Sequence, residues 1–185
     1  MEQVKYGIIL FMLLTIPPVV HLMESIMIIH MHMQMPMIVV AGFLMAPFFQ
    51  KKFPHFFSKW NQSGIPGILL FSIIMLYWML PITMDEALTE LGMEVFKFFS
   101  LAFLAGVPLR DSWKKMTDMA KNVLLSVFLA VFSLMGLLYL FAPVQLCNNY
   151  LRIEQITLGW GFVATALCLL IYLLQLYFID PSEYE

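Results

Sequence analysis

Long hydrophobic runs dominate the chain, and short polar segments separate them. The runs cover residues 6–23, 27–49, 65–81, 92–108, 122–142 and 158–179. A helix needs about 20 mostly apolar residues to cross the hydrocarbon core of a bilayer. The pattern therefore predicts an all-α, polytopic transmembrane helix bundle of about six spans, which forms a single domain over residues 1–185. Gly42 and Gly106 lie inside two of these runs and are expected to allow close helix packing.

The boundary between the first two runs is the weakest in the pattern. The segment 23–27, "MESIM", must contain the turn, although it is short and lacks glycine and proline. An alternative is that the second span begins near Pro36, which leaves residues 24–35 as an outer re-entrant or interfacial segment. Both arrangements keep His30 and His32 near the same surface. The N-terminal run lacks a small-residue cleavage site, so we expect a retained first helix.

The composition agrees with a multi-pass membrane protein and excludes several classes of function. Hydrophobic residues make up 62% of the 185 residues and charged residues 12%, against roughly 25% charged residues in soluble domains. A P-loop, a dinucleotide fingerprint, a GxSxG elbow and an HExxH pair are all absent. The basic segments are too short for a nucleic-acid footprint. We therefore expect no enzymatic activity and no nucleic-acid partner, with the lipid bilayer and other membrane subunits as the expected partners.

The positions of the basic residues predict the orientation in the membrane. Eight of the ten lysines and arginines fall in segments on one predicted side: Lys5, Lys51, Lys52, Lys59, Arg110, Lys114, Lys115 and Lys121. Lysine and arginine accumulate in cytoplasmic loops of multi-pass proteins. Both termini are therefore predicted to be cytoplasmic, and the acidic loop "ITMDEALTEL" to face outward.

Candidate chemistry concentrates in residues 21–37, "HLMESIMIIHMHMQMPM". This stretch holds three of the four histidines and six of the 16 methionines. Thioether sulfur and imidazole nitrogen suit copper, and methionine favours Cu(I). We hypothesise an outer copper site built from His21, His30 and His32, assisted by Met27, Met31 or Met33. The alternative is that the methionines only pack, since methionine commonly fills gaps between apolar side chains.

Charged residues and cysteines outside this stretch each have a structural interpretation, and some also have a functional one. Glu94 and Lys97 are spaced to form an ion pair at the start of the fourth run, and a structural or snorkelling role is favoured over an intramembrane proton or ligand contact. Asp85 can supply a carboxylate to a metal site, although a solvated acidic face is the simpler interpretation. Cys147 falls in a predicted outer loop and Cys168 inside the last run, so we expect no disulfide between them.

Two segments resemble the CtaG family of multi-helix membrane proteins, which is linked to assembly of the copper centre of cytochrome c oxidase, and a shorter archaeal relative. "HLMESIMIIHMHMQMPMIVVAGFLMAPFF" is similar to the family's His-Leu-Met and His-Met-x-Gln stretch, and "YWMLPITMDEAL" to its Trp-His-x-Pro segment. The resemblance implies copper handling at the outer face of the plasma membrane of a bacterium or archaeon. By position it carries over His21, His30 and Gln34 as polar site residues, with the two histidines as ligands.

The chain departs from the family pattern in three places. Met79 follows Trp78 where the family has a histidine. Glu94 and Lys97 occupy the helix that usually brings further histidines. The chain also has six predicted spans where longer family members have seven. The site has therefore lost ligands, gained methionine or carboxylate substitutes, or become structural.

Three functions follow as hypotheses. The first is a non-enzymatic membrane protein that holds or delivers Cu(I) for a respiratory or copper oxygenase complex. The second is an accessory or structural subunit whose methionine-rich helices pack against partner helices. The third is a haem-binding, cytochrome b-like subunit with His21 and either His30 or His32 as axial ligands.

Overall fold

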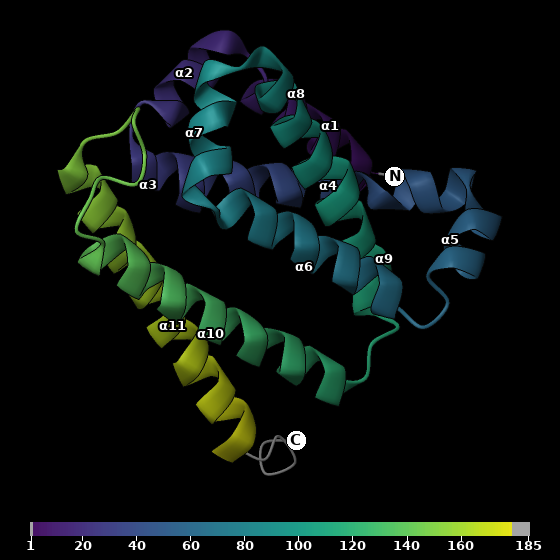
Figure 1. Ribbon diagram of the computed structural model, residues 1–185. Helices are drawn as coiled ribbons and strands as arrows, with labels where there is room; N and C mark the ends of the chain where they lie inside the picture. Colours follow the sequence, from purple (N-terminus) through teal and green to yellow (C-terminus); the bar gives the residue numbers. More distant parts are fainter. Residues whose placement is uncertain (1, 179–185) are drawn as a thin grey trace.

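The structure is a computed structural model that describes residues 2–178, and over this range it contains helices and no strands (Figure 1). The expected all-α fold is confirmed for these residues. In chain order the elements are α1 (Glu2–Leu14), α2 (Pro17–Glu24), α3 (Met27–Ile29), the π-helix η1 (His30–Gln34), α4 (Met35–Lys52), α5 (Pro54–Trp60), α6 (Ile65–Met79), α7 (Pro81–Thr89), α8 (Leu91–Phe99), the π-helix η2 (Ser100–Gly106), α9 (Val107–Trp113), α10 (Asp118–Phe141) and α11 (Arg152–Phe178).

Within the described range, four continuous helices are long and apolar enough to cross a membrane: Met27–Lys52, Leu91–Trp113, Asp118–Phe141 and Arg152–Phe178. The run 6–23 is broken by a bend of 72° between α1 and α2, and the run 65–81 forms α6, which is bent by 87° from the preceding α5. The count reaches the expected six only if each bent pair is one span. The expected end of the last span, residue 179, lies outside the described residues.

The turn between the first two runs lies in the short segment after Glu24. α2 ends at Glu24, and α3 begins at Met27 and continues through η1 into α4 as one helix. The second helix therefore begins at Met27, and the alternative start near Pro36 is not observed. Pro36 is the second residue of α4, two positions after η1 ends, and its ring nitrogen has no hydrogen to donate. The helix passes through this proline where the π-helix returns to α-helical spacing.

Close packing of α4 against η2 depends on two glycines, as the sequence predicts. A Cβ atom on Gly42 would overlap the backbone of Ala102, and one on Gly106 would overlap the backbone of Val39. Backbones can approach this closely only where both helices lack side chains at the crossing. The crossing joins the helix that carries His30 and His32 to the helix that carries Lys97.

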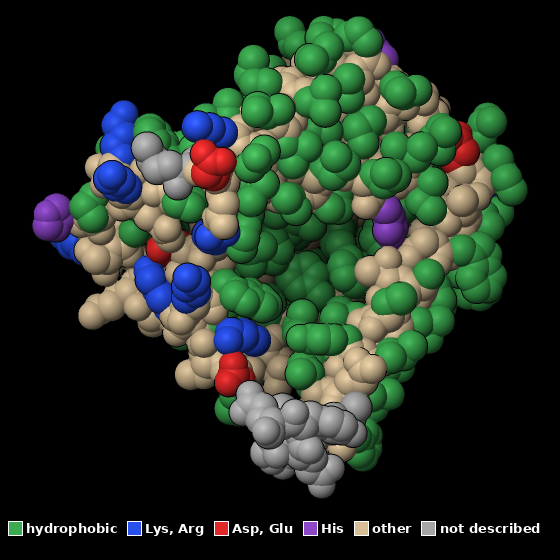
Figure 2. Space-filling model, turned by 180° about the vertical axis from the view of Figure 1, so that it is seen from behind, with side chains coloured by type: hydrophobic (Ala, Val, Ile, Leu, Met, Phe, Trp, Pro, Cys, Tyr) green, Lys and Arg blue, Asp and Glu red, His purple; other side chains and the backbone are tan. Residues whose placement is uncertain are grey.

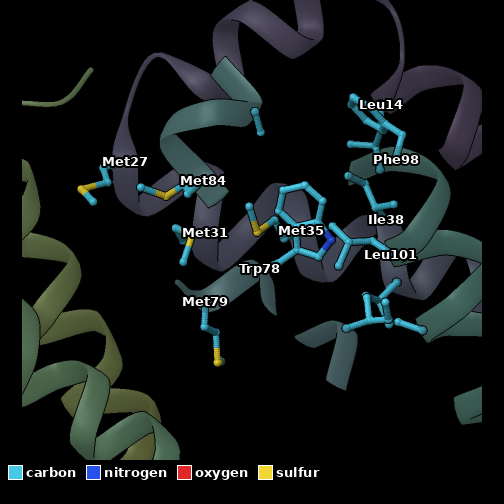
Figure 3. Close-up of a cluster of buried hydrophobic side chains, with 14 of the residues drawn as sticks. Leu14, Met27, Met31, Met35, Ile38, Trp78, Met79, Met84, Phe98 and Leu101 are labelled. Carbon is cyan, nitrogen blue, oxygen red and sulfur yellow. The ribbon is translucent and has the colours of Figure 1, made fainter. Parts of the chain in front are cut away.

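The main core is rich in methionine and aromatic side chains. Figure 3 shows Trp78 between side chains from several helices, with Met31, Met35, Met79 and Met84 around it. Trp78 is 1% exposed, and its indole N–H donates to Ser100 Oγ at 2.8 Å. A buried indole needs such a partner for its polar end. This hydrogen bond fixes the ring between α6 and η2.

A buried carboxylate organises the break between α5 and α6. Asp111 accepts hydrogen bonds from Gln50 at 2.8 Å, Asn61 at 2.7 Å and Lys115 at 2.6 Å. The Asn61 side-chain oxygen in turn accepts the Gly67 amide at 2.9 Å. Since a buried carboxylate is costly without several donors, this network holds the loop before α6 in one conformation.

Candidate functional site

A buried polar cluster lies where α2, η1 and α8 meet the loop before α11. Lys97 is fully buried, and its ammonium group forms an ion pair with Glu24 and a 3.3 Å contact with His30 Nε2. His30 Nδ1 lies 2.9 Å from the Tyr150 hydroxyl. That hydroxyl donates to the backbone carbonyl of Glu24 at 2.7 Å. Glu24, Lys97, His30 and Tyr150 thus form a closed hydrogen-bonded ring, which we call the polar ring.

The chemistry of the donors assigns the protons in the polar ring. The Tyr150 hydroxyl has one hydrogen and donates it to the Glu24 carbonyl, so His30 Nδ1 carries a hydrogen and donates to the Tyr150 oxygen. His30 Nε2 is then the acceptor for the Lys97 ammonium group. Both nitrogens of the His30 imidazole are therefore engaged. A metal ion can use this histidine only if the polar ring opens.

Two π-helices border the polar ring. η1 contains His30, and η2 begins at Ser100, one turn after Lys97. Gln34, at the end of η1, is fully buried; its amide nitrogen lies 3.5 Å from Glu24 Oε1, and its carbonyl oxygen has no hydrogen-bond partner among the described residues. Short π-helical segments within α-helices occur frequently at functional sites. Their position here marks this end of the bundle as the candidate site.

Lys97 pairs with Glu24, whereas its spacing suggested a pair with Glu94. The side chain of Glu24 is 11% exposed and that of Lys97 is fully buried. Glu94 is half-buried and borders a separate surface pocket with Phe11 and Val95. The bend between α1 and α2 carries Glu24 to Lys97, a tertiary contact that helical spacing cannot predict.

A cavity of about 200 Å³ shares the helix segment η1 with the polar ring, but none of the four ring residues lines it and its walls are largely apolar. Its walls come from η1, α4, α6, η2, α10 and α11, and they are formed by Met31, His32, Met35, Pro36, Met75, Trp78, Met79, Leu101, Phe132, Phe162 and Thr165. Figure 2 shows a deep hollow lined by hydrophobic side chains, with a histidine at its edge. We call this space, with one imidazole and four thioethers in its walls, the His/Met cavity.

His32 provides the imidazole in the wall of the His/Met cavity. Its Nδ1 atom is buried and has no hydrogen-bond partner among the described residues. Its ring packs against Phe162 with the centroids 4.8 Å apart. A buried polar atom without a partner is costly and is a common feature of sites that receive a ligand. His32 differs in this from His30, whose two nitrogens are both engaged.

The structure divides the predicted copper ligands among separate environments. His30 belongs to the polar ring, and His32 and Met31 line the His/Met cavity. His21 is exposed on α2, and Met33 is 51% exposed. Met27 is fully buried in the core, and Figure 3 shows it on the same side of Trp78 as Met84. Over residues 2–178, no three His, Cys, Asp or Glu side chains are grouped closely enough to hold a metal ion.

Asp85 holds the loop before α11 against α7. Its carboxylate accepts hydrogen bonds from the Asn148 side chain at 2.9 Å and from the Asn149 side chain at 2.8 Å. Partial burial opposes ionisation of Asp85, but the hydrogen bonds from Asn149 and Asn148 outweigh this effect and hold its pKa below the usual range. Asp85 therefore has a structural role in this loop and lines neither the polar ring nor the His/Met cavity.

Both cysteines are free thiols. Cys168 is exposed on α11, and Cys147 is buried in the loop before that helix. Burial, reinforced by the nearby charge of Asp85, raises the pKa of Cys147 to about 12. Cys147 therefore stays protonated at neutral pH, and a thiol is a much poorer metal ligand than a thiolate.

Sequence reasoning missed Tyr150, Glu24, Met35 and Met75 as site residues. Glu24 carried a detectable signal, because it is an acidic residue beside the histidines in an otherwise apolar stretch. Tyr150 carried none, since it joins the polar ring from more than a hundred residues away. Comparisons with protein-family models, curated proteins and solved structures found no match to this chain.

Proposed function

We propose that this chain is an integral membrane protein that binds Cu(I) without catalysing a reaction, and holds it for transfer to another membrane protein. The observation that carries the proposal is the His/Met cavity, where the imidazole of His32 and four methionine side chains share one apolar space. Thioethers and imidazole are ligands suited to Cu(I), and a low-polarity environment disfavours strongly hydrated divalent ions.

The arrangement of the methionines supports this function over simple packing. Met31 and Met35 are four residues apart on one helix, and Met75 and Met79 are four residues apart on another. Residues at this spacing share a helix face, so each helix presents two thioethers to the same cavity. Two pairs of soft ligands beside an imidazole with an unpaired nitrogen can surround a monovalent copper ion.

The membrane setting and orientation form part of the same proposal. The four to six apolar helices are consistent with a multi-pass protein of a bacterial or archaeal plasma membrane. The basic segments then face the cytoplasm together with both termini. In this orientation the polar ring and the His/Met cavity lie toward the outer half of the bilayer. The resemblance to the CtaG family points to a respiratory or copper oxygenase complex as the recipient.

Measurement of copper in the purified chain tests the proposal directly. The full chain, with Cys168 replaced by Ala to remove the exposed thiol, is loaded with Cu(I) in mild detergent under reducing conditions. It is then dialysed against a Cu(I) chelator and analysed by mass spectrometry for copper per chain. We expect about one copper per chain when all four cavity methionines are present. In a M31L/M35L/M75L/M79L variant of the same chain, we expect the affinity for Cu(I) to fall at least tenfold. Leucine preserves volume and apolarity while it removes the sulfur.

A matched variant controls for general effects of methionine and histidine removal. H21N/M33L changes two exposed side chains that lie outside the His/Met cavity, and should bind copper as the native chain does. Equal elution volumes and melting temperatures establish that the variants are folded. Full copper occupancy in the four-methionine variant, or no copper in the native chain, would refute the proposal.

A second candidate function is that of an accessory subunit. Large apolar side chains of α10 and α11 are exposed, among them Leu134 at 65% and Phe141 at 76%. Such faces can pack against partner helices as well as against lipid. Stable co-purification with other subunits, with no copper on this chain after loading, is the outcome that favours this function. Haem ligation is less suited, because the polar ring engages both nitrogens of His30, and because His21 is exposed and does not line the cavity that His32 borders.

A further inference from the structure

The helix α5 leaves the bundle at a steep angle and is anchored by one face. It is bent by 87° from α6, so it runs across the direction of that helix. Phe57 is 8% exposed and packs with Ala46 and Val107 in a small separate cluster. If α6 crosses the membrane, α5 lies along its surface, with Phe57 turned toward the protein.

The remaining side chains around α5 combine exposed aromatic rings with lysines. Phe53 is 49% exposed and Phe56 is 58% exposed, and the Phe56 ring stacks on Trp60 with the centroids 5.8 Å apart. The Lys52 ammonium group lies 5.8 Å from the centre of the Phe53 ring. Aromatic rings beside lysines are typical of segments at the boundary between headgroups and acyl chains. We define the α5 surface as Lys51, Lys52, Phe53, Phe56, Lys59 and Trp60.

The positive charge of the α5 surface is not neutralised within the described part of the chain. Lys51, Lys52 and Lys59 are exposed and have no carboxylate within 4.0 Å there. In the basic loop between α9 and α10, by contrast, Lys115 pairs with Asp111 and Lys121 pairs with Asp118, although Lys114 forms no ion pair among the residues that the structure describes. Figure 2 shows lysine and arginine side chains gathered toward one end of the molecule. Three exposed lysines on one short segment, without a carboxylate partner in the described part of the chain, can attract anions from their surroundings.

We propose that the α5 surface is a binding site for anionic phospholipids. The lysines bind the lipid phosphate, and the exposed rings of Phe53 and Phe56 enter the upper acyl-chain region. This inference rests on the membrane insertion included in the proposed function and is independent of copper. Lysines close to a bilayer surface are attracted by anionic headgroups, an effect that salt weakens.

Lipid binding to the full chain in detergent tests the site. Native mass spectrometry compares phosphatidylglycerol with phosphatidylcholine of the same acyl chains at graded concentrations. We expect phosphatidylglycerol to bind more tightly, and K52Q/K59Q to weaken its binding about fivefold for each lysine removed. K5Q/K121Q removes two lysines that pair with Glu2 and Asp118, and it should leave lipid binding unchanged.

The aromatic part of the site has its own variant. F56A is expected to weaken binding of both lipids by a similar factor, because it removes apolar contact and no charge. Equal binding of both lipids to the native chain, or equal losses in K52Q/K59Q and K5Q/K121Q, would overturn the inference. Equal binding would leave the lysines available to an acidic protein partner. Neither result bears on copper binding, so failure here is distinct from failure of the proposed function.

Discussion

The ammonium group of Lys97 is fully buried, and burial of a charge carries a large desolvation cost. A buried charge is tolerated only when partners surround it, and here Glu24, His30 and the ring of Phe98 do so. The same contacts explain why His30 resembles a metal ligand in sequence yet serves as a hydrogen-bonding residue in the fold. A histidine binds a metal only through a ring nitrogen that is free, and His32 meets that condition better than His30.

A double-mutant cycle on the ion pair tests this view of Lys97. Lys97→Met leaves the carboxylate of Glu24 without its cation and should destabilise the protein by about 3–5 kcal/mol. Glu24→Gln combined with Lys97→Met should be more stable than Lys97→Met alone, because no uncompensated charge remains. Unfolding in a denaturing detergent, followed by circular dichroism, measures each stability. Additive losses in the double variant would contradict a direct coupling of the two charges.

At the scale of elements, the helices meet where small residues remove the obstacle of a side chain. α4 and η2 cross at Gly42 and Gly106, and α10 and α11 approach at Gly136 and Gly159. Within a bilayer, apolar burial alone drives helix association weakly, because lipid chains are as apolar as the helices. Close backbone approach and van der Waals contact therefore have greater importance here than in a water-soluble bundle.

Alanine substitution should have opposite effects on stability at two of the glycines. Gly106→Ala forces the backbones of α4 and η2 apart and should destabilise the protein by about 1–3 kcal/mol. Gly92→Ala is the matched control, since nothing lies within 4 Å of the added Cβ and alanine favours a helix by about 1 kcal/mol. Melting temperatures in detergent should fall for the first and stay level or rise for the second. A similar fall for both would show that the crossing is not the cause.

At the scale of the whole molecule, α10 and α11 pack mainly against each other and form a pair. Figure 1 shows this pair to one side of the remaining helices. The connecting loop is held by Asp85 from α7 and by Tyr150 in the polar ring. The His/Met cavity lies between the two parts, because α10 and α11 supply Phe132 and Phe162 to its walls. Its shape therefore depends on how the loop holds the helix pair.

The loop contact should make stability depend on pH in the acid range. The folded pKa of Asp85 is lowered from 3.8, so the ionised carboxylate stabilises the folded state above that value, and this contribution disappears as the pH falls through the folded pKa. Asp85→Asn should therefore be less stable than the native chain at neutral pH, by a difference that shrinks below pH 3.8. Unfolding free energies of both chains across pH measure this difference. A constant difference across the acid range would exclude Asp85 as its source.

The sequence alone was sufficient for features that depend on neighbouring residues. Long hydrophobic runs predict helices, because a helix satisfies its backbone N–H and C=O groups within the same segment. The all-helical fold over residues 2–178 follows from this local property. The tight packing at Gly42 and Gly106 was also predictable, since glycine is the residue without a Cβ atom. The copper hypothesis likewise came from ligand chemistry that residue types carry with them, and it stays a prediction.

Only the tertiary structure decided which of these side chains meet. The polar ring joins residues 24, 30, 97 and 150, and the His/Met cavity brings Met75 and Met79 to His32. The bend before α2 brings Glu24 to Lys97, and the loop before α11 brings Tyr150 to His30. Neither the bend nor the loop produces a periodic pattern in the sequence. Helical spacing reports neighbours within about one turn. Contacts between residues that are dozens of positions apart in the sequence depend on how whole helices pack. This packing explains why Lys97 pairs with Glu24 and why His30 and His32 have different environments.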